Sequence, residues 1–164
     1  MKLRNLEIKD ASYMLEWMHD PTVVEFMNAN FAEKTITDCQ NFIQYSNEQT
    51  RDLNLAIVDK NDEYMGTVSL KHIDVIEKNA EFAITVRKIA MGQGFSKYGM
   101  NEILRIGKER YQMEKIVWCV SKNNLRAVSF YDKNGYERTD LVPNNILKHY
   151  NTKMLSDLLW YVYS

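Results

Sequence analysis

The sequence is short of the residues that several kinds of protein require. Its only two cysteines, Cys39 and Cys119, are far apart and show no CxxC spacing, so they indicate no disulfide framework. The three histidines are equally scattered, and no zinc-ligand spacing appears. No apolar run approaches the ~20 residues that a membrane-spanning helix needs. We therefore expect reduced cysteines, no bound metal and no membrane partner.

Neither sign of charge prevails in the composition. The 21 Lys and Arg residues nearly balance 22 Asp and Glu, and they form no basic run that would indicate nucleic acid as a partner. Met1 to Asp10 mixes charged with apolar residues, unlike a signal peptide. We expect a cytoplasmic protein, and the length of 164 residues predicts one domain over residues 1–164.

Hydrophobic periodicity predicts both strands and helices along the chain. A capping box at Thr37 and Gln40 and a cap at Asp10 are expected to begin the first two helices, and Gly135 to end the last one. Short polar turns between residues 53 and 86 predict an antiparallel meander, after which a strand, loop, helix and strand form a βαβ unit. The predicted fold class is α+β, or mixed α/β. The expected strands cover 3–8, 53–59, 64–74, 79–86, 115–120, 136–141 and 155–163, and the helices follow Asp10 and cover 37–50, 95–111 and 125–134.

A glycine-rich loop, Met91 to Ser96, joins the strand that ends at Val86 to the following long helix. Glycine tolerates positive φ, and the free N–H groups at the start of a helix attract anions. The junction therefore favours a phosphorylated ligand, although such a loop is about as often only a tight turn. The absence of GK[ST] and of an acidic ribose ligand counts against the Walker and Rossmann types of nucleotide site.

The order of elements and two motifs resemble the GNAT superfamily of acetyl-CoA-dependent N-acetyltransferases over essentially the whole chain. The family's pyrophosphate loop, Q/R-x-x-G-x-G/A, falls on Met91 to Ser96, where Gly94 matches and both end residues depart. The resemblance implies a mixed, mostly antiparallel sheet of about seven strands with about four helices. The second motif, N-x-x-A-x-x-x-Y-x-K-x-G-F/Y, is matched by Asn124, Ala127, Tyr131, Lys133, Gly135 and Tyr136.

The resemblance also implies roles for these residues. An amine attacks the thioester of acetyl-CoA, and Tyr131, near the sulfur, would protonate the leaving thiolate. A backbone N–H within Phe82 to Val86, a strand that in the family splays from its neighbour to admit pantetheine, would stabilise the oxyanion. The expected cofactor-binding residues are Ile84, Thr85, Val86, Met91, Gly92, Gln93, Gly94, Phe95, Ser96, Lys97, Asn124 and Tyr131.

The reaction also requires a general base, for which the sequence offers two candidates. Some relatives carry a glutamate at the position that is Cys119 here. Glu81 is the best carboxylate available, in a segment similar to the A-E-F/Y-x-I run of polyamine and ribosomal-protein acetyltransferases. A glutamate that faces solvent or pairs with Lys71 explains the same residue about as well. His72 is an alternative base.

The acceptor is predicted only by class. Gly66 to Leu70 resembles the G-x-x-x-L strand of RimJ/RimL-like members, whose substrates include protein N-termini, polyamines and nucleotide-linked amino sugars. We expect a small amine first, with a protein N-terminus as the alternative. The departures at Met91, Ser96 and Cys119 leave open a non-catalytic acyl-CoA-binding domain. An exposed edge near Leu158 could pair two subunits, so a monomer or a homodimer is expected.

Overall fold

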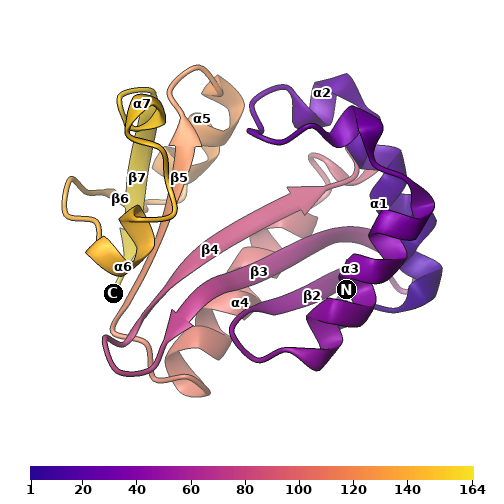
Figure 1. Ribbon diagram of the computed structural model, residues 1–164, viewed down its shortest axis with the longest axis horizontal. Helices are drawn as coiled ribbons and strands as arrows, with labels where there is room; N and C mark the ends of the chain where they lie inside the picture. Colours follow the sequence, from indigo (N-terminus) through magenta and orange to yellow (C-terminus); the bar gives the residue numbers. More distant parts are fainter.

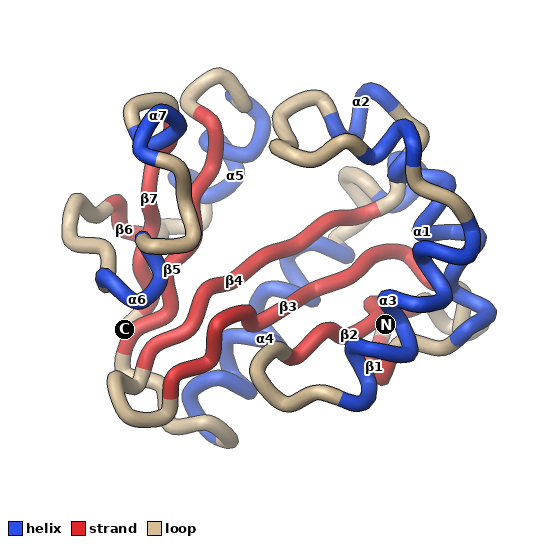
Figure 2. Tube along the Cα trace, in the orientation of Figure 1, coloured by secondary structure: helices blue, strands red, loops and turns tan.

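A seven-stranded sheet runs through the computed structural model, which describes residues 1–164, with the strand order β1-β2-β3-β4-β5-β7-β6 (Figures 1 and 2). Neighbouring strands are antiparallel except for β4 and β5, which run parallel. The predicted mixed and mostly antiparallel sheet is confirmed. The strands are β1 (Lys2–Asn5), β2 (Leu53–Val58), β3 (Tyr64–Asp74), β4 (Asn79–Val86), β5 (Lys115–Ser121), β6 (Glu137–Arg138) and β7 (Leu158–Tyr163).

Helices cover both faces of this sheet. In Figures 1 and 2 the helix α4 lies behind the sheet, whereas α1 and α3 lie in front of it. The four helices with at least eight residues are α1 (Ala11–Met18), α3 (Ile36–Glu48), α4 (Phe95–Glu109) and α5 (Leu125–Lys133). Three four-residue helices complete the set: α2 (Pro21–Val24), α6 (Asn144–Leu147) and α7 (Thr152–Leu155). None of the helices combines the length and apolar composition needed to cross a bilayer.

Several predicted boundaries were wrong for identifiable reasons. The capping box of α3 is formed by Thr35 and Asp38, whose side chains each accept a bond from the other's backbone N–H. This pair lies two residues before the expected pair, Thr37 and Gln40. The Asp10 carboxylate does not cap α1, because it accepts bonds from Arg4 and from the Glu7 N–H at the start of the preceding 3-10 helix, Ile8–Asp10. The strand expected over 136–141 pairs only at Glu137 and Arg138 before the chain leaves the sheet edge.

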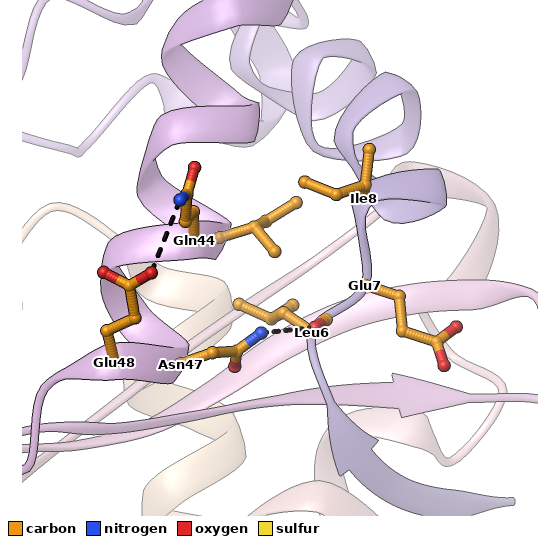
Figure 3. A pocket seen from close by; sticks show the side chains of 7 residues that line it. Leu6, Glu7, Ile8, Gln44, Asn47 and Glu48 are labelled. Atoms are coloured by element: carbon orange, nitrogen blue, oxygen red, sulfur yellow. Dashed lines mark hydrogen bonds between the residues drawn. The ribbon is translucent and has the colours of Figure 1, made fainter.

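The helix α3 packs against the segment that follows β1. Asn47 Nδ2 donates to the Leu6 carbonyl at 2.8 Å, and Leu6 and Ile43 are both buried there. An open surface pocket lies between the two segments (Figure 3). None of the predicted catalytic or cofactor-binding residues lines it.

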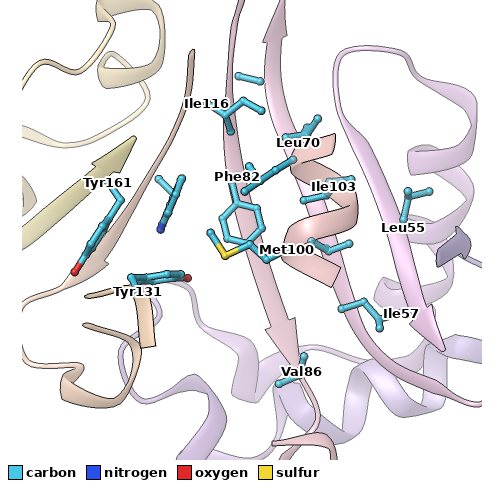
Figure 4. Close-up of a cluster of buried hydrophobic side chains, with 14 of the residues drawn as sticks. Leu55, Ile57, Leu70, Phe82, Val86, Met100, Ile103, Ile116, Tyr131 and Tyr161 are labelled. Carbon is cyan, nitrogen blue, oxygen red and sulfur yellow. The ribbon is translucent and has the colours of Figure 1, made fainter. Parts of the chain in front are cut away.

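The main core lies between α4 and the sheet (Figure 4). The helix buries Met100, Ile103 and Leu104 together with two glycines, Gly99 and Gly107. A Cβ on Gly107 would stand 2.6 Å from Ile116 Cδ1, so glycine lets the helix approach the sheet closely. Ile116 therefore faces α4, whereas its neighbour Val117 packs on the opposite face against Ile146 of α6. This alternation assigns each residue of the central strands to one face.

Arg87, just after β4, joins three separate parts of the chain. Its guanidinium bonds Glu16 of α1 at 2.7 and 3.0 Å and Glu63 of the β2–β3 turn at 2.7 Å. It also lies 4.4 Å from the ring centroid of Tyr13. Only 6% of the residue is exposed. These contacts fix the end of β4 against the N-terminal helices.

Candidate active site

β4 and β5 pair over only three positions, Asn79 with Lys115, Ala80 with Ile116 and Glu81 with Val117. Beyond Glu81, β4 continues beside β3 to Val86, whereas β5 continues beside β7 to Ser121. The two strands therefore diverge at the centre of the sheet, as Figure 1 shows. The splay predicted for Phe82 to Val86 is present.

The backbone of β4 presents unpaired groups to this gap. In an antiparallel strand, the N–H and C=O groups of one residue both point to the neighbouring strand on one side, and those of the next residue point to the other side. Because the Arg87 N–H donates to the Met65 carbonyl of β3, Thr85 also pairs with β3, and Ile84 and Val86 face the other way. Of the three predicted contacts on β4, Ile84 and Val86 thus direct their N–H and C=O groups into the gap, and Thr85 does not.

The glycine loop lies at the end of β4 and begins α4. Gly92 and Gly94 have φ values of 76° and 88°, which L side chains rarely adopt. The N–H groups of Gly94, Phe95, Ser96 and Lys97 donate to no group of the chain. Gln93 differs, since its N–H donates to the Ala90 carbonyl at 3.4 Å and its side chain to the Ile89 carbonyl at 2.8 Å. The free N–H groups at the positive end of a 15-residue helix suit an anion such as a diphosphate.

Helix α5 meets this loop from the other side of the gap. Its N-cap is Asn124, whose side-chain oxygen accepts from the Ala127 N–H at 3.2 Å. The amide NH2 of Asn124 donates to no group of the chain and is free for a cofactor. Two residues on, Arg126 Nη1 lies 3.0 Å from the Met91 sulfur. The two motifs that the sequence analysis singled out therefore touch across the opening.

Tyr131 of α5 is buried among aromatic rings. Its ring centroid lies 5.5 Å from that of Trp118 and 5.1 Å from that of Tyr161. Its hydroxyl bonds no group of the chain, and in Figure 4 it is directed toward β4. Burial raises the pKa of Tyr131 above its ordinary value, so the phenol stays protonated at neutral pH. Tyr131 can therefore donate a proton or a hydrogen bond into the gap.

Glu81 stands at the last paired position of β4, where the gap begins. It is only 2% exposed and lies on the face opposite α4. Its Oε2 accepts a hydrogen bond from the Tyr150 hydroxyl, whereas its Oε1 is buried without any hydrogen-bond partner. A buried carboxylate oxygen without a donor is costly, and such atoms call for an explanation. Of the alternative considered for Glu81, exposure to solvent is absent, whereas the approach to Lys71 is present at 4.0 Å.

An open pocket of about 470 Å³ lies beside Glu81. Two of its residues come from β3: His72 Nε2 lies 3.6 Å and Lys71 Nζ 4.0 Å from Glu81 Oε1, too far for a hydrogen bond. The His72 ring stacks on His149, with centroids 3.7 Å apart. Burial, followed by repulsion from His149, lowers the pKa of His72, so this imidazole is neutral near pH 7. The remaining lining residues are Asn28, Tyr150, Asn151 and Met154.

Segments that are far apart in the sequence meet at the wall of this pocket. Asn28 Nδ2 contacts the Met154 sulfur at 2.9 Å, which brings the loop after α2 against α7. Tyr150 also accepts a contact from Cys119 Sγ at 3.4 Å. Burial raises the pKa of the Cys119 thiol to about 11, so this residue is neutral and supplies no base in place of a carboxylate.

The structure gathers the predicted residues around one gap but adds residues that the motifs did not contain. Tyr150, His149 and Asn28 belong to short connecting segments with no periodic pattern. Only the polar and aromatic character of His149 and Tyr150 distinguishes them in the sequence. No three His, Cys, Asp or Glu side chains come together as metal ligands would.

Comparisons with known proteins agree with this geometry. The profile of a family described as an acetyltransferase (GNAT) domain matches residues 1–137. An uncharacterized N-acetyltransferase, p20 of Bacillus licheniformis, is 23% identical over 151 residues, which cover 87% of this chain and 82% of that protein.

Solved structures show the same fold along almost the entire chain. The spermidine N-acetyltransferase of Vibrio cholerae in complex with CoA and spermine aligns with a TM-score of 0.79 at 18% identity, covering 99% of this chain and 94% of that one. A dodecameric structure of spermidine N-acetyltransferase from the same organism, in an intermediate state, aligns with a TM-score of 0.73 at 19% identity and covers 99% and 92% of the two chains.

Proposed function

Since the chain belongs to the GNAT acetyltransferase family and is an acetyl-CoA-dependent acyltransferase, we propose that it acetylates a small primary amine by direct attack in a ternary complex. The observation that carries the proposal is the position of Glu81. Its unpartnered oxygen lies where the gap between β4 and β5 begins and also borders a polar pocket on the opposite face from α4. An acyl donor in the gap and an amine in the pocket would therefore meet at this residue.

The residues along the gap fit acetyl-CoA. Free N–H groups from Gly94 to Lys97 would hold the diphosphate, and the unpaired backbone groups of Ile84 and Val86 would bind the amides of the pantetheine arm. Bound there, acetyl-CoA supplies the thioester whose acetyl group is transferred. The Asn124 amide NH2 is placed to donate from α5.

Two side chains would handle the protons of the transfer. Glu81 would accept a proton from the acceptor's ammonium, directly or through water, so that a neutral amine attacks as the new C–N bond forms. Tyr131 would donate its proton to the sulfur as the C–S bond breaks, and the proton that the nitrogen loses as it becomes an amide would return to the Tyr131 phenolate. A backbone N–H of β4, from Ile84 or Val86, would stabilise the developing negative charge on oxygen.

A Tyr131→Phe variant tests this assignment. We expect kcat to fall by about 100-fold, because general acids typically contribute that much or more, while the affinity for acetyl-CoA changes little. The matched control is Tyr136→Phe, whose ring lies in the same aromatic cluster but whose hydroxyl contacts Asn101 at 3.5 Å. Acetylation would be followed over a panel of amines.

The outcomes of these measurements distinguish the proposed enzyme from its alternatives. Equal rates for Tyr131→Phe and the intact enzyme would show that this phenol is not the general acid. If acetyl-CoA raises the melting temperature but no amine is acetylated, the protein is a non-catalytic acyl-CoA-binding domain. Failure of CoA to bind in calorimetry would exclude both.

We also propose a branch of the family and an oligomeric state. For the RimJ/RimL-like branch, the support is Gly66, where a Cβ would stand 2.5 Å from the Thr85 carbonyl oxygen and the family's glycine is therefore required. A monomer or homodimer in the cytoplasm stays a prediction, which sedimentation analysis can test for the oligomeric state.

A further inference from the structure

The pocket beside Glu81 contains few formal charges. Of its eight lining residues, Glu81 is the only acid and Lys71 is the only base that is always charged. His72 is neutral near pH 7, for the reasons given above. The remaining walls offer amide, hydroxyl, imidazole and thioether groups. The formal charges of Glu81 and Lys71 thus cancel, and Glu81 is the only group of the pocket that attracts a cation.

The one acid is oriented toward a ligand. Glu81 Oε2 is bonded by Tyr150, which leaves Oε1 as the single carboxylate oxygen that lacks a donor. The ammonium of an acceptor carries three N–H donors and would satisfy it. A second ammonium on the same molecule would find no second carboxylate, and it would meet Lys71, whose Nζ lies 4.0 Å from Oε1.

The pocket walls suit an uncharged polar body. Asn28 uses its amide NH2 on the Met154 sulfur and retains a free carbonyl oxygen, whereas Asn151 uses its oxygen on the Lys153 N–H and retains a free NH2. The stacked rings of His72 and His149 add nitrogen atoms that donate or accept. Such a mixture of neutral donors and acceptors matches hydroxyl and amide groups.

We propose, on the basis of the proposed function, that the acceptor is a monoamine: one ammonium that binds Glu81, carried by an uncharged body with hydroxyl or amide groups, as in an amino sugar. A polyamine is disfavoured by the same charges. Lys71 is thus a specificity-determining residue, because its ammonium repels a second cation.

Two pairs of acceptors test this inference. The first pair, 4-amino-1-butanol and 1,4-diaminobutane, has the same chain length and differs in one terminal group. The second pair is glucosamine and spermidine. We expect kcat/KM, measured by release of the CoA thiol, to favour the monoamine of each pair by about tenfold or more, since like charges at one binding site repel.

Substitutions that change the charge of Lys71 test whether this residue causes the preference for monoamines. The preference should shrink in Lys71→Gln and vanish or reverse in Lys71→Glu. The matched control is Lys78→Glu, which makes the same change at an exposed lysine paired with Glu114 at 3.6 Å outside the pocket, and it should keep the preference. High salt should also narrow the preference in the unaltered enzyme, because it screens exposed charges.

The results separate this inference from the proposed function. Equal or faster acetylation of the polyamines, or a preference that ignores Lys71, overturns the inference while the acetyltransferase activity stands. If the Lys71→Glu variant does not fold, the Lys71→Gln variant and the salt series decide instead. Acetylation of none of the four amines contradicts the proposed function itself, and the inference falls with it.

Discussion

Glu81 has two carboxylate oxygens in different situations. Tyr150 bonds Oε2 and so fixes the orientation of the carboxylate, whereas Oε1 stands 3.6 Å from His72 and 4.0 Å from Lys71 without a bond to either. A residue whose only purpose was to stabilise the fold would gain from a closer contact. The arrangement preserves an acceptor oxygen at the cost of a buried unpaired atom, which is typical of a functional site.

A Glu81→Gln variant keeps the shape of the side chain and removes the base. We expect kcat/KM for the amine to fall by about 100-fold or more, because general-base catalysis contributes on that scale, and acetyl-CoA to bind as before. Stability should change little, since Tyr150 can still donate to the amide oxygen and the ion pair that is lost, with Lys71 at 4.0 Å, is long and partly exposed. The control is Glu77→Gln, at an exposed position of the β3–β4 turn. An unchanged rate in Glu81→Gln would exclude Glu81 as the base and favour His72.

His72 gives the protein a specific dependence on pH. Burial and repulsion from His149 lower the pKa of His72 in the folded state, so the unfolded chain binds this proton more readily. Stability should therefore decrease as pH falls below about 6.5, the pKa of an unperturbed histidine, until the lowered pKa of the folded state is passed.

Melting curves of His72→Asn between pH 7 and pH 5 check this expectation. His72 has a φ of 54°, and asparagine is among the residues that tolerate this region. The variant should lose less of its melting temperature in acid than the unaltered protein does. A control at the exposed His19, His19→Asn, should behave like the unaltered protein, and an equal effect of both changes would contradict the assignment to His72.

Among the helices and strands, those with a long periodic pattern were predictable. Helix α4 and strand β4 begin and end within two residues of their predicted bounds, because fifteen and eight residues give the pattern room to repeat. The four-residue helices α6 and α7 were missed, since one turn contains no period. These two helices frame His149 and Tyr150, so half of the pocket beside Glu81 could not be predicted from the sequence. Tyr131 and Glu81 could be, because each lies within a motif on a regular element.

The start of α4 depends on backbone conformation. Gly94 is the N-cap with φ of 88°, and an added Cβ would meet only Met1 Cε at 3.7 Å, so any cost of substitution is conformational. We expect Gly94→Ala to reduce stability by about 1–2 kcal/mol and also to weaken acetyl-CoA binding. Gly135→Ala is a matched control, with φ of 78° and no atom within 4 Å of the added Cβ. It should show the loss of stability without the loss of binding, and equal binding losses would contradict a cofactor role for the loop.

At the scale of the whole molecule, Arg87 connects the sheet to its N-terminal layer. Its partners Glu16 and Glu63 are about half exposed, with side-chain values of 51% and 40%, and water can rehydrate them when the arginine is removed. We therefore expect Arg87→Met to cost about 1–3 kcal/mol, less than the loss of a fully buried pair. Chemical denaturation measures this directly. A matched exposed change, Arg105→Met, removes two surface pairs and should cost under about 1 kcal/mol.

Because β4 and β5 diverge, binding of a cofactor in the gap and the stability of the fold are coupled. A continuous sheet would pair the backbone groups of Ile84 and Val86 with another strand, whereas here they are unpaired and the proposed cofactor would complete the ladder. A ligand that binds only the folded chain stabilises it by about 2.7 kcal/mol when present at a hundred times its dissociation constant. A substitution that only loosens the packing between the two halves of the sheet would thus first reduce the affinity for the cofactor. Substitutions far from the gap would then change the affinity of this enzyme for its acyl donor.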